Sequence, residues 1–181
     1  MDFPMKVERL MSRPSFSIVR DCFEDYRNEH MPCKGGVDNQ CAVRMSVALV
    51  RSGFGLERFQ TPARVHKGRR SCRLSVPHVL GAEELEKFLR RTLGKPLEFS
   101  HRDLRRPDLV MQCLRGLTGI TYFNNMFTRH DQHKATGDHI DLFNGDRCYN
   151  DILGISPGSG TPTGTLSFFQ KSDRVSFFYL A

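Results

Sequence analysis

The chain has 181 residues, which is long enough to bury a sizeable core and too short for two ordinary domains. Its formal charge of +7 favours an anionic partner such as a nucleic acid, a membrane surface or the cell envelope. No stretch approaches the ~18 apolar residues of a membrane span, and the N-terminal residues lack the apolar run of a secretory signal. We therefore expect one domain over residues 1–181, without an internal repeat or a linker.

Apolar side chains at helical spacing predict a first helix from Ser12 or Ser15 to about Asn28. A second helix is predicted to follow a cap at Asp38 or Asn39 and to end before Gly53. The remaining predicted elements are an exposed loop over 58–73, helices over 82–92 and 108–114, a buried strand over 119–127, a polar loop over 128–135, a hairpin around residues 144 and 145, a flexible connection over 156–164, and strands over 165–170 and 174–180. Helices followed by a sheet indicate an α+β fold in which the second helix packs on that sheet.

Cys41 falls in the first turn of the second predicted helix. Unpaired backbone N–H groups and the positive end of the helix dipole favour a thiolate at such a position. The same N–H groups can donate to a developing oxyanion. Cys41 also shares an apolar stripe with Met45 and Leu49, so an inert core cysteine is the alternative. Arg44 and Arg51 are expected elsewhere on the surface of this helix.

The dipeptide Asn144-Gly145 between two alternating runs is a strong hairpin signal, because both residues tolerate positive φ. With these two residues as the loop, His139 faces Asn150 within hydrogen-bond reach. Asn150 would then hold the imidazole in one tautomer, leaving the other nitrogen to take a thiol proton. Asp151 would point to the opposite face unless the turn is one residue longer. A surface hairpin with a solvated histidine is the alternative.

Two long segments, 39–46 and 137–145, together resemble the fourth family of type VI secretion amidase effectors. Those proteins are papain-like cysteine peptidases of the NlpC/P60 type that cut bacterial peptidoglycan. Short segments similar to the family occur in the same order at 13–16, 52–54, 94–96, 116–120 and 163–166. The resemblance therefore implies an NlpC/P60-like α+β fold, with a nucleophile helix packed on an antiparallel sheet.

The resemblance also implies the site. Cys41 matches the family nucleophile and His139 matches the family base. The third family residue is an aspartate, and the position that matches it here is Asn150, with Asp151 one residue further on. Asparagine can orient an imidazole but adds no charge. Either Asn150 or Asp151 is therefore expected to hold the ring.

Gln40 is expected to assist the backbone N–H groups as an oxyanion donor. Asp141, two residues after His139, either binds the amine of diaminopimelate or contacts water. The resemblance implies cleavage between D-glutamate and meso-diaminopimelate in the peptide stem, without a cofactor. It further implies a cognate immunity protein, and delivery by a type VI apparatus from the cytoplasm, without a signal peptide, to the periplasm of target bacteria.

Two other functions stay open at this point. A zinc hydrolase would use a His/Asp cluster, although it would leave Cys41 idle. The residues of that cluster are His130, His133, His139 and Asp141. A non-catalytic basic protein would bind nucleic acid or another protein through two basic groups, but neither group has the pattern of a nucleic-acid motif. These groups are Arg64, Lys67, Arg69, Arg70 and Arg73, and then Arg102, Arg105 and Arg106.

Overall fold

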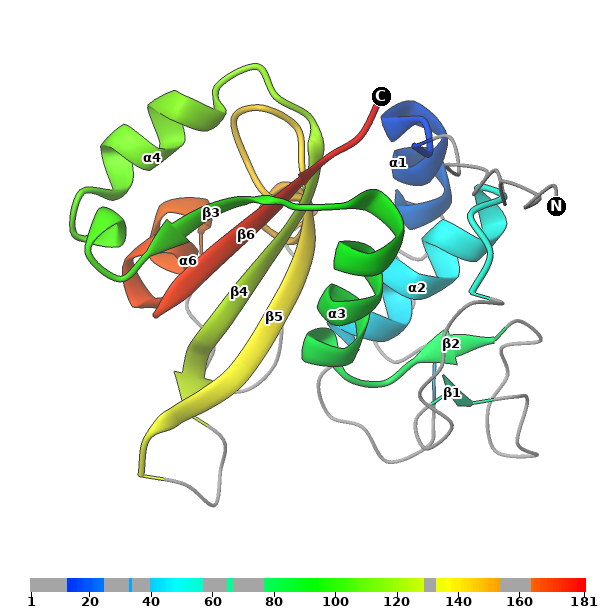
Figure 1. Cartoon of the computed structure of the whole chain (residues 1–181), viewed down its shortest axis with the longest axis horizontal. Coiled ribbons are helices and arrows are strands. Elements are labelled where there is room, and N and C mark those ends of the chain that lie inside the picture. The colour runs from blue at the N-terminus through cyan, green and yellow to red at the C-terminus, as the bar shows by residue number, and fades with distance from the viewer. Residues whose placement is uncertain are drawn as a thin grey trace, which may run out of the picture.

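The computed structural model describes residues 13–24, 33, 40–56, 65–66, 77–128, 133–153 and 164–181. Its centre is a four-stranded antiparallel sheet in the order β3-β6-β4-β5 (Figure 1). The strands are β3 (Leu97–Ser100), β4 (Gly119–Thr128), β5 (Ala135–Phe143) and β6 (Arg174–Tyr179), with a separate pair of β1 (Val65–His66) and β2 (His78–Val79). The helices are α1 (Phe16–Glu24), α2 (Cys41–Arg51), α3 (Ala82–Leu93), the 3-10 turn η1 (Asp103–Arg105), α4 (Pro107–Leu114), α5 (Tyr149–Ile152) and α6 (Thr165–Lys171). The expected α+β class with an antiparallel sheet is confirmed.

Helices cover both faces of the sheet, with α1, α2 and α3 on one side and α4 and α6 on the other (Figure 1). Because side chains alternate along a strand, β4, β5 and β6 each supply residues to two cores. On β4, Ile120 and Tyr122 pack into the core that contains α1, α2 and α3. Phe123 packs into the other core with Phe168 of α6. Each such buried side chain contributes roughly 2 kcal/mol to folding.

Helix α2 is enclosed by its neighbours, which include α1, α3, β2 and β5. Every residue from Cys41 to Leu49 is buried. The hydroxyl of Ser46 accepts a hydrogen bond of 2.9 Å from the backbone N–H of Val79, which attaches β2 to this helix. The expectation that Arg44 lies on the helix surface is wrong, since only 4% of it is exposed. A helix buried on most of its circumference has no wide polar face.

The ends of α2 agree closely with the sequence prediction. Gln40 takes the N-cap position, one residue after Asn39, and both predicted cap residues lie outside the described residues. Gly53 follows the helix with φ of 84° and donates its N–H to Val50. Such a left-handed residue ends many helices, and glycine adopts it without steric cost.

Four other predicted elements are confirmed within one or two residues at each end. They are α3, α4, β4 and β6. Helix α1 begins as predicted and is described as far as Glu24, while residues 25–28 of the predicted helix lie outside the described residues. Most of the predicted loops over 58–73, 128–135 and 156–164 also lie outside them. Within the first loop, Val65 and His66 are described, and the prediction is wrong there because they form strand β1.

The predicted strand over 165–170 is wrong, because these residues form α6. Short apolar runs do not distinguish a strand from a buried helix. Phe168 and Phe169 are adjacent, and both contact the ring of Phe123 on the same side of the sheet. Adjacent residues of a strand would point to opposite faces, so this packing requires a helix here.

The predicted two-residue hairpin is also wrong. Strand β5 ends at Phe143, which forms an isolated bridge with Cys148, and the chain then enters α5 instead of a returning strand. The side chain of Asn144 accepts hydrogen bonds from the N–H groups of Asp146 and Arg147, at 3.0 and 2.8 Å. These bonds close a turn longer than two residues. The chain after the turn is helix α5, so β5 pairs with β4 on one side and lies at the edge of the sheet.

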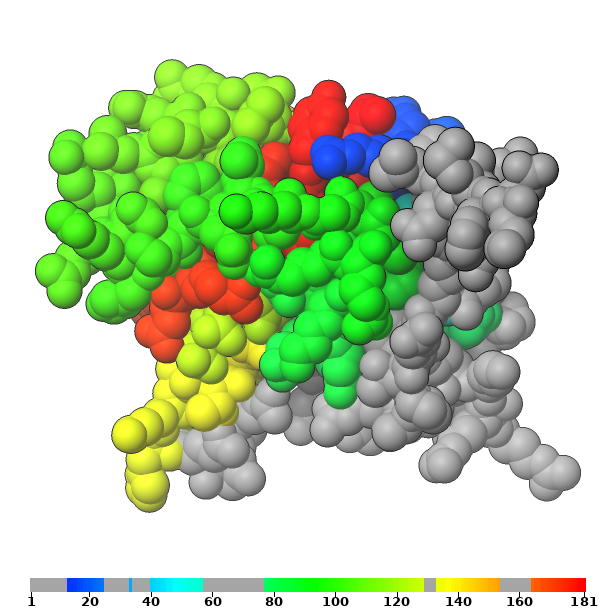
Figure 2. Space-filling model, in the orientation of Figure 1, coloured from blue at the N-terminus to red at the C-terminus, as the bar shows by residue number. Residues whose placement is uncertain are grey.

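The start of β5 projects from the body of the molecule (Figure 2, yellow). Ala135 and Thr136 are exposed, whereas every residue from His139 to Phe143 is buried. The middle of this edge strand is therefore enclosed, and His139 and Asp141 lie there.

None of the described helices is long and apolar enough to cross a bilayer.

Candidate active site

Three elements bring Cys41, His139 and Asn150 together beside the edge strand. Cys41 opens α2, His139 lies in the middle of β5, and Asn150 lies in the first turn of α5. All three are buried. The thiol of Cys41 interacts with the imidazole, and one amide atom of Asn150, Nδ2, lies 3.3 Å from Nε2 of His139. The site therefore combines a thiol and an imidazole from segments about a hundred residues apart.

Two phenyl rings hold the imidazole of His139 in place. The ring of Phe123, on the paired position of β4, stacks on it with centroids 6.0 Å apart and an angle of 22°. The ring of Phe168 from α6 meets it edge-on at 5.4 Å. These contacts leave the ring little freedom to rotate, since interiors are close-packed. His139 is thus oriented by packing as well as by polar groups.

A carboxylate lies on the same strand face as the imidazole. Oδ2 of Asp141 is 3.6 Å from Nε2 of His139. The carboxylate also accepts backbone hydrogen bonds from Leu142 at 2.8 Å and from Asn150 at 3.0 Å. An ionised carboxylate only accepts hydrogen bonds, so it favours a proton on Nε2. The other nitrogen, Nδ1, is buried and has no hydrogen-bond partner among the described residues, so it is available to take a proton from the thiol.

The amide of Asn150 fits the same tautomer. Its Oδ1 is buried and has no hydrogen-bond partner among the described residues, while Nδ2 faces the imidazole. Oxygen and nitrogen of such an amide are assigned from their surroundings. With the two exchanged, Oδ1 accepts a hydrogen bond from protonated Nε2 of His139, as a Cys-His-Asn site requires.

The electrostatics of the site favour the imidazolium. Burial by itself would lower the pKa of His139, but the hydrogen bonds and charges of Asp141 and Cys41 outweigh burial and raise it to about 9. Burial raises the pKa of Asp141, against the hydrogen bonds from His139 and from the N–H groups of Asn150 and Leu142. Those donors favour the ionised carboxylate but do not outweigh burial, and the carboxylate lies beside Nε2 of the imidazole.

Arg44 adds a cation that the sequence analysis missed. It lies three residues after Cys41. Burial lowers the pKa of the guanidinium, and the charges of Cys41 and Asp141 oppose this shift only in part. The three-residue spacing could have revealed it, because residues i and i+3 of a helix are neighbours. A buried guanidinium beside a thiol and a carboxylate stabilises the anionic form of either group.

The remaining predicted residues lie in the same region but have other partners. Both polar ends of the Gln40 side chain bind the backbone of Cys33, at 2.9 and 2.6 Å. The carboxylate of Asp151 accepts hydrogen bonds from the N–H and the hydroxyl of Thr165, at 3.0 and 2.8 Å, and so stabilises the start of α6. Of the two open alternatives, Asn150 contacts His139 and Asp151 contacts Thr165.

Half of the residues that the rival functions would use lie outside the described residues. His130 and the first basic group lie there, while His133, Arg102, Arg105 and Arg106 are exposed. Within the described part of the chain, no group of three His, Cys, Asp or Glu side chains is arranged to hold a metal ion.

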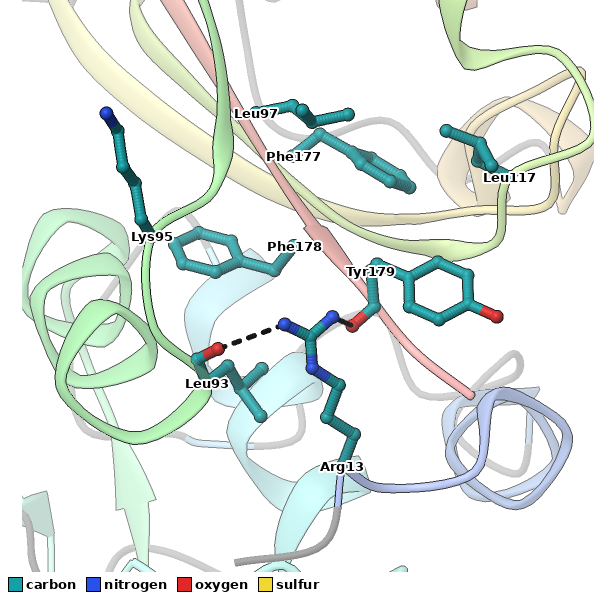
Figure 3. Close-up of a pocket in the computed structure, with 8 residues that line it drawn as sticks. All are labelled: Arg13, Leu93, Lys95, Leu97, Leu117, Phe177, Phe178 and Tyr179. Atoms are coloured by element: carbon teal, nitrogen blue, oxygen red, sulfur yellow. Dashed lines mark hydrogen bonds between the residues drawn. The ribbon is translucent and has the colours of Figure 1, made fainter. Parts of the chain in front are cut away.

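A pocket of about 390 Å³ lies at the other edge of the sheet, near the ends of β3 and β6 (Figure 3). Arg13 crosses its rim and donates hydrogen bonds to the carbonyl groups of Leu93 and Tyr179, at 3.3 and 3.2 Å. This contact fastens the segment before α1 to the end of β6. No residue that lines the pocket belongs to the group around Cys41, so it is separate from the candidate site.

Comparisons with known proteins identify the family and the fold. Residues 37–178 match the family model described as type VI secretion system (T6SS), amidase effector protein 4. The structure is similar to that of the Tae4/Tai4 effector–immunity system from Salmonella typhimurium, with a TM-score of 0.62, 19% identity, and coverage of 94% of this chain and 100% of that chain. It is also similar to the Tae4–Tai4 complex from Enterobacter cloacae, with a TM-score of 0.58, 22% identity, and coverage of 93% and 99%. At such identities the structural matches support the fold. No curated protein sequence matches the chain.

Proposed function

The chain belongs to the family of type VI secretion system amidase effectors known as amidase effector protein 4, and we propose that it is an antibacterial peptidoglycan amidase with a Cys41–His139 catalytic pair. We further propose that residues 1–181 form one catalytic domain with an NlpC/P60-like, papain-like fold. The observation that carries the proposal is the contact between the thiol of Cys41, at the start of a buried helix, and the imidazole of His139. The pKa of this imidazole is raised to about 9. A thiol and an imidazolium so arranged are the parts of a cysteine hydrolase.

In the proposed reaction, Nδ1 of His139 takes the proton of the Cys41 thiol, and the thiolate attacks the carbonyl carbon of a stem peptide. Backbone N–H groups in the first turn of α2 donate to the oxyanion that develops. The imidazolium then gives its proton to the leaving amine, and a thioester forms. Water hydrolyses this thioester, with His139 acting as the base, and the free thiol returns.

We assign the orienting role to Asn150 and the charge-stabilising role to Asp141. Asn150 bonds to the ring at Nε2, and Asp141 supplies a carboxylate 3.6 Å from the same atom. Asp141 accepts the N–H groups of Leu142 and Asn150 and lies beside the imidazole, so we assign it to supporting the imidazole instead of binding the amine of the substrate. Gln40 holds the chain before α2 in place, which leaves the backbone N–H groups as oxyanion donors.

The proposed substrate is the peptide stem of peptidoglycan, cut between D-glutamate and meso-diaminopimelate. Family membership supports this class of substrate, and the net charge of +7 suits the anionic envelope. Delivery by a type VI apparatus would bring the protein to the periplasm of target bacteria. Since the similar Tae4 structures are effector–immunity complexes with Tai4, we propose a Tai4-like immunity protein as partner.

The test is mass spectrometry of purified peptidoglycan after digestion with the wild type, Cys41→Ala and His139→Ala. We expect fragments that end in D-glutamate or begin with diaminopimelate from the wild type alone. Cys113→Ala is the matched control, because this cysteine is exposed on α4 and should be dispensable. Cleavage by Cys41→Ala, or loss of wild-type cleavage with a chelator instead of a thiol alkylator, would refute the cysteine mechanism and favour the zinc hydrolase.

A further inference from the structure

Strand β4 carries a wide bulge opposite the residue that precedes His139. Phe123 pairs with His139, and the next pair is Phe127 with Gly137. Three residues of β4, 124–126, therefore lie opposite the single residue Asp138 of β5. Bulges bend and twist a strand pair, and they occur often beside active sites, where they redirect a side chain.

The bulge contains a conformation that ordinary residues avoid. Asn125 has φ of 52°, and no other described residue except glycine has a positive φ. This left-handed region is unfavourable for residues with a side chain, although asparagine tolerates it better than most. Such a conformation persists where surrounding contacts hold it in place.

Asp138 provides the central contact. Its Oδ1 accepts a hydrogen bond of 2.9 Å from the backbone N–H of Asn125 and a bond of 3.1 Å from the side chain of Asn124. Asp173 completes the arrangement, because its carboxylate accepts a bond from the Asn125 side chain at 3.0 Å and its N–H donates to the Asn124 carbonyl at 3.0 Å. The half-buried carboxylate of Asp138 thus accepts a hydrogen bond from the backbone of Asn125, the residue with positive φ.

The residues on both sides of Asp138 are also fixed to β4. At Gly137, an added Cβ would lie 2.2 Å from the ring of Phe127, so this ring covers the glycine. At His139, the ring of Phe123 stacks on the imidazole. The direction of the imidazole therefore depends on how β5 is rotated against the bulge. A change of strand register by one residue would turn His139 to the opposite face.

We propose that Asp138 is a positioning residue: by bonding to the β4 bulge it sets the rotation of β5 and so aims the imidazole of His139 at Cys41. This inference rests on the proposed function, in which those two side chains react. Asp138 lies on the strand face opposite His139, and it acts through the backbone without touching the reacting atoms.

The test compares Asp138→Ala, which removes the hydrogen bonds of this carboxylate, including one with the hydroxyl of Tyr122, with Asp138→Asn, which retains Oδ1 as an acceptor. Asp21→Ala removes an exposed carboxylate from α1 and is the matched control. For Asp138→Ala we expect kcat for a stem peptide to fall roughly 10- to 100-fold, with KM within about twofold, because small misplacements of a catalytic group have effects of this size. Asp138→Asn and Asp21→Ala should stay within about threefold of the wild type.

A second readout does not require activity. The imidazole protons of His139 can be followed by NMR over a pH series. In Asp138→Ala the midpoint should move from about 9 towards the ordinary value near 6.5, because a rotated ring loses its contacts with Asp141 and Cys41. A purely structural residue would lower the melting temperature and leave this midpoint unchanged.

A third variant tests the cause and covers poor folding of Asp138→Ala. Adding Asn125→Gly should recover at least about threefold of the lost kcat, because glycine adopts positive φ without help. The inference would be overturned if the titration midpoint of His139 were unchanged in Asp138→Ala, or if that variant changed KM alone. It would also be overturned if Asp138→Asn lost as much kcat as Asp138→Ala. If Cys41→Ala remained active, the proposed function would fail, but the NMR midpoint would still decide whether Asp138 positions the ring.

Discussion

Replacing Asp141 by asparagine should separate the charge of the site from its shape. Asparagine has the same size and keeps an oxygen that can accept the backbone N–H of Leu142 or Asn150. It removes the negative charge 3.6 Å from Nε2 of His139. Any loss of activity can then be assigned mainly to the charge.

The size of the effect follows from the imidazole. The pKa of His139 is raised from 6.5 to about 9, which corresponds to roughly 3 kcal/mol in favour of the imidazolium. The hydrogen bond of Asp141 is the largest contribution that raises it, ahead of that of Cys41. Without this carboxylate, Cys41 alone would oppose the lowering of the imidazole pKa by burial. We expect kcat to fall at least about 100-fold, as when the aspartate of a Ser-His-Asp triad is replaced by asparagine.

The assay is the pH dependence of kcat/KM on a synthetic stem peptide. In the wild type, activity should decline above about pH 9, where the imidazolium loses its proton. In Asp141→Asn the decline should begin near neutral pH. Asp151→Asn is the control, because the carboxylate of Asp151 binds Thr165. This substitution should change the stability of the protein but not the pH at which activity declines. An alkaline limb that stays near pH 9 in Asp141→Asn, with kcat within threefold, would refute the reasoning.

Three further predictions concern the surroundings of this pair. Arg44→Met should slow the alkylation of Cys41 by iodoacetamide roughly 10-fold, because a buried cation beside the sulfur is lost, and Arg44→Lys should recover part of the rate. Gly137→Ala should lower the free energy of unfolding by about 1–3 kcal/mol in urea titrations, because its Cβ would overlap the ring of Phe127. The folded pKa of His139 exceeds the ordinary value, so its contribution to stability is complete below pH 6.5 and is lost as pH rises through about 9. The difference in unfolding free energy between wild type and His139→Gln should therefore shrink over that interval; a difference that grows with pH would contradict the sign.

Much of the geometry of the candidate site was predictable from local signals. A cysteine in the first turn of a helix and a histidine in a β-strand each follow from short-range patterns, and the helix end at Gly53 follows from its glycine. The contact between His139 and Asn150 is present, but the predicted route to it is wrong, because Asn150 belongs to a helix. The side chain of Asn144 can close a wider turn, and the dipeptide alone does not reveal which turn forms.

Tertiary packing decided what local patterns left open. Arg44 is polar, and a polar residue on an amphipathic helix is normally expected to face water. It is buried because α2 has neighbours on several sides, including strand β5 with Asp141. The segment at 165–170 likewise forms a helix because a single core receives both Phe168 and Phe169. Neither outcome can be read from a short window, since each depends on residues far away in sequence.

The roles of the carboxylate and the amide are linked by the fold itself. Asp141 accepts the N–H of Asn150 in the first turn of α5, so the group proposed to stabilise the imidazolium also holds the helix that carries the amide proposed to orient it. Because Asp141 and His139 are two residues apart on one strand, they share a face, and a slip of β5 by one residue would turn both to the other face. That register depends on the bulge that Asp138 holds. A carboxylate two positions after the histidine can therefore supply the charge that Asn150 lacks, provided that β5 is held firmly against β4.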